Sequence, residues 1–203
     1  MKIVDLTQNL NEGTPVYPGD PRTKIESAGV FEKDGYNDHL VSVGTHVGTH
    51  IDAPLHMIPN GKTLDQFTLE QFVGRGKYIK VENKTFDIKA LEQAGIGESD
   101  IVLFHTGMDE LYGKDDYFKI YPEIPEEVAK FLSERKVKIV GMDMASPDYP
   151  PFKIHKLLLG SGVLIIENLT NLSELAGKEF EVYALPIKLQ IDAAPARVIA
   201  EVK

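Results

Sequence analysis

The sequence predicts a mixed α/β fold in a single domain that spans residues 1–203. Three observations support this prediction. A chain of 203 residues is long enough for one substantial core and short for two. Strand patterns dominate the early and late parts of the chain, whereas strands and helices alternate in the middle. No internal repeat, linker or low-complexity segment divides it.

In the first half, strands are the main predicted elements. Glycines and prolines between Asn11 and Pro21 end the first strand. Asp34-Gly35 is typical of a turn that joins the two strands of a hairpin. Asp87 could cap a helix that Gly95 could end. We expect strands at 2–10, 24–31, 38–45 and 76–81, a short helical piece at 68–72 and a helix at 87–94.

In the second half, strands and helices alternate before a closing pair of strands. Ile101–His105 is a continuous apolar run of the kind found in buried strands. Pro125 starts a helix with Glu126 and Glu127 at its positive end. We expect strands at 101–105, 139–144, 163–167, 179–191 and 196–202, and helical segments from 125, at 152–159 and at 172–176. The charged segment 109–121 is predicted to be an irregular loop, as a lid or an oligomer contact.

Composition excludes several functions. A formal net charge of −9 argues against a nucleic-acid partner, which needs a basic face. There is no cysteine, so a metal must be held by nitrogen and oxygen. The apolar runs are too short to cross a membrane, and Asp5 stands where the apolar core of a targeting signal should begin. We therefore expect a cytoplasmic protein with no membrane partner.

The segment 46–56 carries the main chemical signal. His46, His50, Asp52 and His56 are ligand types that zinc prefers and manganese accepts, and half of the six histidines lie here. A single histidine is more often structural, but this clustering favours a metal site. Gly48 and the proline at 54 disfavour a helix. The segment is therefore predicted to be the end of a strand that runs into an irregular loop.

The residues alone leave the number of metals open. His46, His50 and Asp52 could hold one metal with an open position for water. His155, taken alone, would more often be a core or surface residue. Glu167 ends an apolar run, where a free carboxylate would be unfavourable to bury; its default interpretation is a strand-end residue that faces solvent.

The pattern His46-x-Gly48-Thr49-His50-x-Asp52-x-Pro54-x-His56 resembles the signature of the metal-dependent cyclase family, which includes bacterial kynurenine formamidase and isatin hydrolase. His155, followed twelve positions later by Glu167-Asn168-Leu169, resembles a second family pattern. This resemblance implies a swivelling β/β/α domain and a homodimer or homotetramer. It also implies that Asp52 bridges two divalent metals, with His46 and His50 on the first and His155 and Glu167 on the second.

The resemblance also implies an activity. Two metals about 3.5 to 4 Å apart can activate one water and share the charge that develops on a carbonyl, and His56 matches the family's general acid/base. Zinc is the first choice of metal and manganese the second. The expected reaction is hydrolysis of a small aromatic amide, with N-formylkynurenine as the first substrate, which makes the chain an arylformamidase. The alternative within this class is isatin hydrolysis, or the opening of another cyclic amide or lactone.

Two further points bear on the substrate and the class. Tyr17 stands where the formamidases usually carry tryptophan, and it either stacks on an aryl ring or is a turn residue without a role. The segment 142–148 also departs from the family pattern, so the pocket wall differs there.

A non-catalytic, metal-stabilised binding module is the alternative from another class, but five ligands plus His56 favour an enzyme. His39 and His105 are interpreted as structural.

Overall fold

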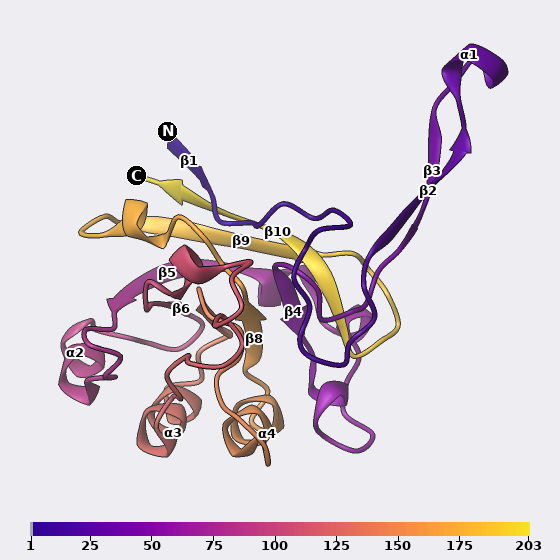
Figure 1. The fold of residues 1–203 in the computed structure, drawn as a ribbon. Coiled ribbons are helices and arrows are strands. Elements are labelled where there is room, and N and C mark those ends of the chain that lie inside the picture. The colour runs from indigo at the N-terminus through magenta and orange to yellow at the C-terminus, as the bar shows by residue number, and fades with distance from the viewer. Residues whose placement is uncertain (1) are drawn as a thin grey trace.

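The computed structural model describes residues 2–203, in which seven strands form a closed, barrel-like sheet (Figure 1). Their order is β10-β4-β8-β7-β6-β5-β9, and β9 pairs again with β10. Closure leaves these strands without a free edge. The strands are β4 (His50–Asp52), β5 (Val73–Lys80), β6 (Ile101–His105), β7 (Ile139–Met142), β8 (Leu164–Glu167), β9 (Phe180–Pro186) and β10 (Ala193–Val202), and β1 (Lys2–Asp5) pairs with β10 from outside.

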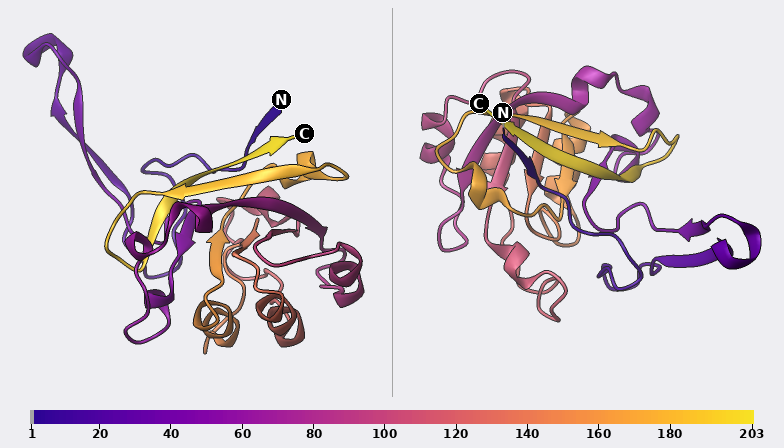
Figure 2. Two further views of the ribbon diagram at one scale, coloured as in Figure 1. Left: turned by 180° about the vertical axis from the view of Figure 1, so that it is seen from behind. Right: turned by 90° about the horizontal axis from the view of Figure 1, so that it is seen from above.

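The four middle strands, β5 to β8, are parallel. Helices α2 (Ile88–Gln93), α3 (Glu126–Glu134) and α4 (Lys153–Gly160) connect them in turn. Figures 1 and 2 show these helices along one side of the sheet, with β9, β10 and β1 on the opposite side. Parallel strands need such crossover connections, and their carboxyl ends therefore meet at one edge of the sheet.

Successive side chains of the middle strands point to opposite faces of the sheet, so these strands contribute to two hydrophobic cores. In β6, Val102 and Phe104 pack with the helices, whereas Ile101 and Leu103 face the cluster inside the barrel. In β8, Ile165 belongs to the helix side. Successive side chains of a strand point to opposite faces. An uninterrupted apolar run is thus what a strand covered on both faces requires.

Gly76 allows β5 and β9 to approach where the barrel closes. A Cβ added at Gly76 would lie 1.9 Å from Cε2 of Phe180, a ring that is itself buried. Real carbon atoms do not approach this closely, and a buried ring cannot move aside. The position therefore requires glycine for steric reasons.

A two-stranded arm extends away from the barrel (Figures 1 and 2). It consists of β2 (Lys24–Gly29), β3 (Asp38–Ser42) and the short helix α1 (Phe31–Asp34) at its tip. All five residues of β3 are exposed, and Phe31 and Leu40 expose 62% and 61% of their surface. An isolated two-stranded hairpin is at best marginally stable in water.

The mixed α/β class is confirmed, and most predicted elements are present. The first strand ends at Asp5 rather than at residue 10, because the Asp5 carboxylate accepts a hydrogen bond from the Thr7 amide and the chain leaves β10. β10 begins earlier than expected, since Ala193–Pro195 pairs with β4. The remaining helical pieces are η1 (Pro54–His56), η2 (Leu64–Gln66), η3 (Leu69–Phe72), η4 (Met108–Leu111) and η5 (Leu172–Leu175).

The segment 109–121 is irregular after η4, as expected, but Tyr117 anchors it to the rest of the protein. Tyr117 is fully buried, and its hydroxyl donates to Oδ1 of Asn168 at 2.7 Å. This contact fixes the segment against the end of β8. Among residues 2–203, none of the helices has both the length and the apolar character needed to cross a bilayer.

Candidate functional site

Strand β4 presents two of the motif residues to one face of the sheet. It pairs with β8 on one side, where His50 lies opposite Glu167, and with β10 on the other, where Asp52 lies opposite Ala193. Ile51 points to the opposite face and is buried inside the barrel. The segment contains the predicted strand end, since β4 stops at Asp52 and an irregular residue and a short helical turn follow; the loop with His46 that precedes the strand was not predicted.

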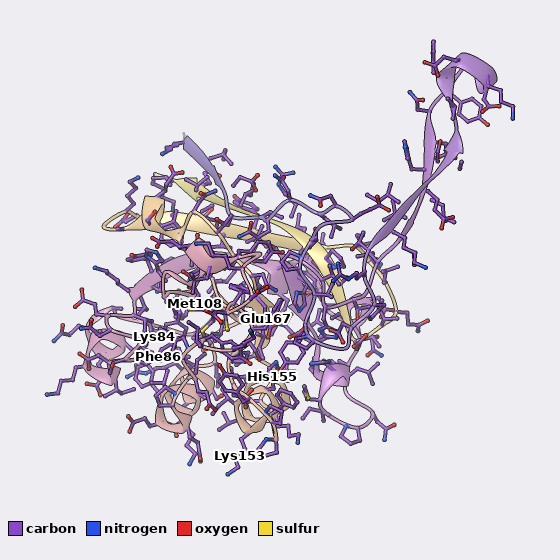
Figure 3. The ribbon with its side chains drawn as sticks, in the orientation of Figure 1. Lys84, Phe86, Met108, Lys153, His155 and Glu167 are labelled. Atoms are coloured by element: carbon purple, nitrogen blue, oxygen red, sulfur yellow. The ribbon has the colours of Figure 1, made fainter. Side chains whose placement is uncertain are left out.

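Helix α4 and strand β8 bring the distant pair to the same place. Nε2 of His155 lies 3.3 Å from Oε1 of Glu167 and 4.0 Å from Oδ2 of Asp52. Figure 3 labels His155 on α4 and Glu167 at the end of β8. All five predicted metal ligands thus converge, although 121 positions separate His46 from Glu167 (167 − 46).

Asp52 lies at the centre of this cluster. Its Oδ1 lies 2.8 Å from Nδ1 of His46 and 3.4 Å from Nε2 of His50, and that Nε2 lies 3.5 Å from Oε2 of Glu167. The structure therefore groups His50, Asp52 and Glu167 closely, and separately groups His46, Asp52 and His56. Asp52 belongs to both groups. The family resemblance implies His46 and His50 on one metal and Glu167 on the other, whereas the closest donors place His50 with Glu167 and His46 with His56.

The chemistry of this donor set fits divalent cations. Both carboxylate oxygens of Asp52 and Nε2 of His50 are buried and make no hydrogen bond, because the nearby histidine nitrogens lie close to Asp52 without hydrogen-bond geometry. Buried polar atoms are nearly always paired, because leaving one unpaired costs about 1 to 3 kcal/mol. Three such atoms directed at one centre, among nitrogen and carboxylate oxygen donors, are what a divalent metal site needs.

Further groups orient the candidate ligands. Nδ1 of His50 hydrogen-bonds the carbonyl of Gly48 at 2.9 Å, and Nδ2 of Asn168 donates to that same carbonyl at 2.9 Å. Nδ1 of His155 lies 2.5 Å from Oδ1 of Asp148. Each contact leaves the Nε2 atom of the ring facing the cluster, and such partners commonly fix the tautomer of a metal ligand.

Burial and neighbouring charges give the histidines of the cluster different pKa values. Burial lowers the pKa of His46, but the Asp52 charge and contacts with Asp52 and Asp192 outweigh it and raise the pKa to about 9. Burial likewise opposes the rise for His155, where Asp148 and Glu167 raise the pKa to about 10. For His56, burial dominates and lowers the pKa to about 4. His56 is therefore the histidine of the three that stays neutral at pH 7.

A pocket opens beside the cluster. His46, His56, His155 and Glu167 line it together with an aromatic wall, in which Tyr17 and Phe118 meet edge to face at 5.7 Å. Its volume is about 210 Å³, and since an apolar cavity of about 150 Å³ can hold benzene, one aryl ring with a short substituent fits. The other lining residues are Pro15, Asp20, Met57, Ala145, Phe152 and Asn168.

The structure adds residues that the sequence reasoning missed. Asp148 and Asp192 contact His155 and His46 directly, and Phe118 and Phe152 line the pocket. Nothing in the sequence singled out these two acids among 31. Only the turn before α4 and the turn before β10 bring them to the histidines.

The two remaining histidines lie elsewhere. His39 is exposed on the arm. Nδ1 of His105 hydrogen-bonds the Tyr78 hydroxyl at 2.7 Å, and His105 groups with Asp109 and Asp143 outside the pocket. The Asp143 carboxylate already accepts three hydrogen bonds from Thr106 and Gly107, which gives it a local structural role.

Comparison with known proteins identifies the family. The family model "Putative cyclase" matches residues 4–149. An uncharacterized protein of Methanocaldococcus jannaschii is 36% identical over 98% of this chain and 99% of its own length. Kynurenine formamidase of Bacillus thuringiensis subsp. konkukian is 32% identical over 97% of this chain and 95% of its own length.

Solved structures of similar proteins share the fold. Isatin hydrolase A from Labrenzia aggregata superposes with a TM-score of 0.86 and 28% identity, over 98% of this chain and 93% of that one. A protein of Bacillus stearothermophilus, described as a predicted metal-dependent hydrolase, gives a TM-score of 0.81 and 31% identity over 98% and 97%. Because the family model covers most of the chain and the similar proteins of named activity are hydrolases, the chain belongs to the cyclase family and is a hydrolase.

Proposed function

We propose that this hydrolase cleaves the carbonyl–nitrogen bond of a small aromatic amide in the pocket beside Asp52. N-formylkynurenine is the first substrate proposed, with formate and an aromatic amine as products. The observation that carries the proposal is the convergence of five side chains with nitrogen and oxygen donors beside a pocket with an aromatic wall: His46, His155 and Glu167 line the pocket, and His50 and Asp52 behind them carry three buried atoms without a hydrogen bond. A kynurenine formamidase among the similar proteins supports the choice of substrate.

We assign the metal ligands to His46, His50, Asp52, His155 and Glu167. Asp52 belongs to both donor groups, so its carboxylate would be the ligand common to two ions; His56, which completes the group of His46 and Asp52, is assigned to proton transfer instead. Zinc is the first choice and manganese the second, since both accept imidazole and carboxylate. When bound, divalent cations polarise a carbonyl and lower the pKa of water, which supplies a nucleophile near neutral pH.

His56 is the proposed general acid/base. It lines the pocket, and its ring is neutral at pH 7 because burial lowers its pKa to about 4. A neutral imidazole can accept the proton that water loses when it attacks the carbonyl. The resulting imidazolium then delivers this proton to the nitrogen as the carbon–nitrogen bond breaks, which allows the amine to leave.

The aromatic wall is proposed to orient the aryl ring. Tyr17 and Phe118 are already in edge-to-face contact, and a substrate ring can extend this arrangement. Phe152 lines the pocket and contacts the ring of His155 at 5.6 Å between centroids. A ring held here would place an attached amide next to the donor cluster. We therefore assign Tyr17 to substrate binding.

A cyclic amide such as isatin is the second candidate substrate. Isatin hydrolase A from Labrenzia aggregata shares the fold of this chain and is 28% identical to it in sequence. A pocket of about 210 Å³ also suits a compact bicyclic ring. Opening a cyclic amide uses the same attack and the same proton delivery, so the two candidates differ in substrate shape and not in the groups that act.

A substrate screen tests the proposal. N-formylkynurenine, isatin and a few lactones are incubated with protein loaded with zinc or with manganese, and product formation is followed by absorbance. His56→Ala is expected to lose at least about 100-fold in kcat, as removal of a general acid/base does, and to keep its bound metal. Gln93→Ala, at an exposed position of α2 away from both the pocket and the arm, is the control with unchanged activity. Equal activity of His56→Ala and Gln93→Ala would remove the proposed role of His56.

Absence of turnover on every candidate, with metal bound, would favour a metal-stabilised binding module instead of an amide hydrolase. That outcome would refute the proposed reaction and leave the fold and family unchanged.

We also propose that the chain forms a homodimer or homotetramer through its arm. Val30, Phe31, Leu40 and Val41 are each at least 44% exposed on a hairpin that the barrel does not cover. Two strands alone do not stabilise such a hairpin in water. A second copy of the chain, which carries the same apolar arm, is the occupant that we propose.

A further inference from the structure

Asp192 lies between a proposed metal ligand and the proposed acid/base. Its Oδ2 is 2.9 Å from Nε2 of His46 and 3.6 Å from Nδ1 of His56. One oxygen atom therefore faces both imidazole rings. The rings themselves lie 4.0 Å apart between centroids, tilted by 38°.

The backbone fixes this acid relative to the cluster. The carbonyl of Asp192 accepts a hydrogen bond from the Ala53 amide at 2.8 Å, and the next residue, Ala193, is paired with Asp52. The rest of the loop before β10, residues 187–190, is exposed. Asp192 is thus the point where this loop joins β10, the strand that pairs with β4 beside Asp52.

The contact with His46 determines which nitrogen of that ring is available. Nδ1 of His46 faces Asp52, so this is the atom that can bind a cation. A neutral imidazole carries one proton, and a ligating nitrogen must be without it. A hydrogen bond from Nε2–H to Asp192 places the proton on the nitrogen that faces away from the cluster, as a carboxylate partner of a ligating histidine does.

The same carboxylate orients His56. The two nitrogens lie on different edges of the ring, so Nδ1 toward Asp192 turns Nε2 away from that acid. At 3.6 Å the contact is longer than a hydrogen bond, and catalytic contacts of this kind often shorten only when substrate is bound. Asp192 itself is not among the residues that line the pocket.

We propose that Asp192 is a shared positioning residue, which fixes the tautomer of His46 for metal binding and the orientation of His56 for proton transfer. Its effect on His56 rests on the proposed function, whereas its effect on His46 needs only a bound metal. Loss of the side chain should therefore weaken metal binding and slow turnover together, without changing the affinity for substrate.

Three variants test this inference. Asp192→Ala removes the acceptor for both rings. Asp192→Asn keeps an oxygen that can accept the hydrogen bond of His46 but lacks the negative charge that faces His56. Gln190→Ala changes an exposed residue of the same loop and is the matched control for disturbance of the loop. Thermal melting of each metal-free variant establishes that it is folded.

Metal affinity is measured by competition of the protein with a chelator, using zinc as the probe. Asp192→Ala is expected to bind zinc about 10- to 100-fold more weakly, the usual loss when the partner of a ligating histidine is removed. Asp192→Asn should stay within about threefold of the wild type, because it restores the acceptor, and Gln190→Ala should bind zinc like the wild type. This readout requires no substrate.

Turnover at saturating zinc then distinguishes a loss of His56 positioning from a general disturbance of the loop. Asp192→Asn is expected to lose about tenfold in kcat with an unchanged KM, although it holds its metal. Zinc affinity and kcat of Asp192→Ala equal to wild type would overturn the inference, as would equal losses in Asp192→Ala and Gln190→Ala. If the wild-type protein hydrolyses none of the candidates but Asp192→Ala alone binds zinc weakly, the proposed function fails and the role toward His46 stands.

Discussion

Asp148 should stabilise both the start of helix α4 and the candidate metal site. Its Oδ1 contacts Nδ1 of His155 at 2.5 Å, and its Oδ2 accepts a hydrogen bond from the Ile154 amide at 2.6 Å. That amide is one of the first N–H groups of α4, which have no partner within the helix. Replacing Asp148 by alanine leaves both donors buried and unpaired.

The size of the effect follows from these two contacts. Asp148 is 2% exposed, so solvent cannot replace either of them. Hydrogen bonds to charged groups contribute about 1.5 to 3 kcal/mol each, which gives a loss of roughly 3 to 6 kcal/mol for Asp148→Ala. This is a large part of the 5 to 15 kcal/mol or so that stabilises a typical domain. The affinity for zinc should fall about 10- to 100-fold, because the ring of His155 loses its partner.

Urea denaturation of the metal-free proteins measures the first effect, and chelator competition measures the second. Asp87→Ala is the matched control, since Asp87 caps α2 through one exposed hydrogen bond to the Lys89 amide at 2.9 Å. Loss of such a cap costs about 1 kcal/mol and should leave zinc binding unchanged. A loss of stability in Asp148→Ala no larger than that in Asp87→Ala, together with wild-type zinc affinity, would refute this reasoning.

Three further predictions follow from the site, the barrel and the arm. Zinc affinity should increase from pH 6 to about pH 10, because zinc must displace a proton from His46 and from His155. Burial lowers the pKa of His46, but Asp52 raises it to about 9. Burial also lowers the pKa of His155, but Asp148 and Glu167 raise it to about 10. In the metal-free protein the contacts of the protonated rings are therefore fully present below the ordinary pKa of 6.5 and are lost as the pH rises through 9 and 10, where the proton no longer competes with the metal. Calorimetric titration that found the same affinity at every pH would contradict this. Gly76→Ala should destabilise the protein by about 1 to 3 kcal/mol or more in urea denaturation, because the new Cβ meets the Phe180 ring. At the control position Gly97, a Cβ meets only atoms at 3.6 Å and beyond, so Gly97→Ala should change the free energy of unfolding by no more than about 0.5 kcal/mol. Equal losses in the two variants would show that the barrel adjusts to the added Cβ. Leu40→Asp should convert a homodimer or homotetramer to a smaller species in light scattering without lowering the melting temperature of the barrel, and an unchanged mass would exclude the arm as the interface.

Local sequence signals predicted most of the elements of the fold. Ile101–His105 was identifiable as a strand because both of its faces are covered, which makes an apolar run continuous. The helix after Pro125 was identifiable from its first acids and its apolar spacing. The β9–β10 pair was expected, because these two strands are adjacent in the sequence. Barrel closure was not predictable in this way, since β4 and β1 pair with β10, and β5 pairs with β9, from distant parts of the sequence.

For the candidate site, too, some residues were evident from the sequence and others only from the structure. The histidines of the 46–56 segment were evident from their density, and His155 and Glu167 became candidates only through the resemblance to a family. The structure brings the five side chains together because His50 is in register with Glu167 across the β4–β8 pair and α4 follows β7. Asp148 and Asp192 had no sequence signal, since an isolated acid is usually a solvated surface residue.

Anomalous X-ray diffraction from zinc-loaded crystals tests most directly whether this hydrolase holds its metals where we propose. Two anomalous peaks are expected within coordination distance of the Asp52 carboxylate, with the five proposed ligands around them and His56 on neither ion. Peaks that lie elsewhere, or a cluster around Asp52 without anomalous signal in crystals soaked with excess zinc, would contradict it.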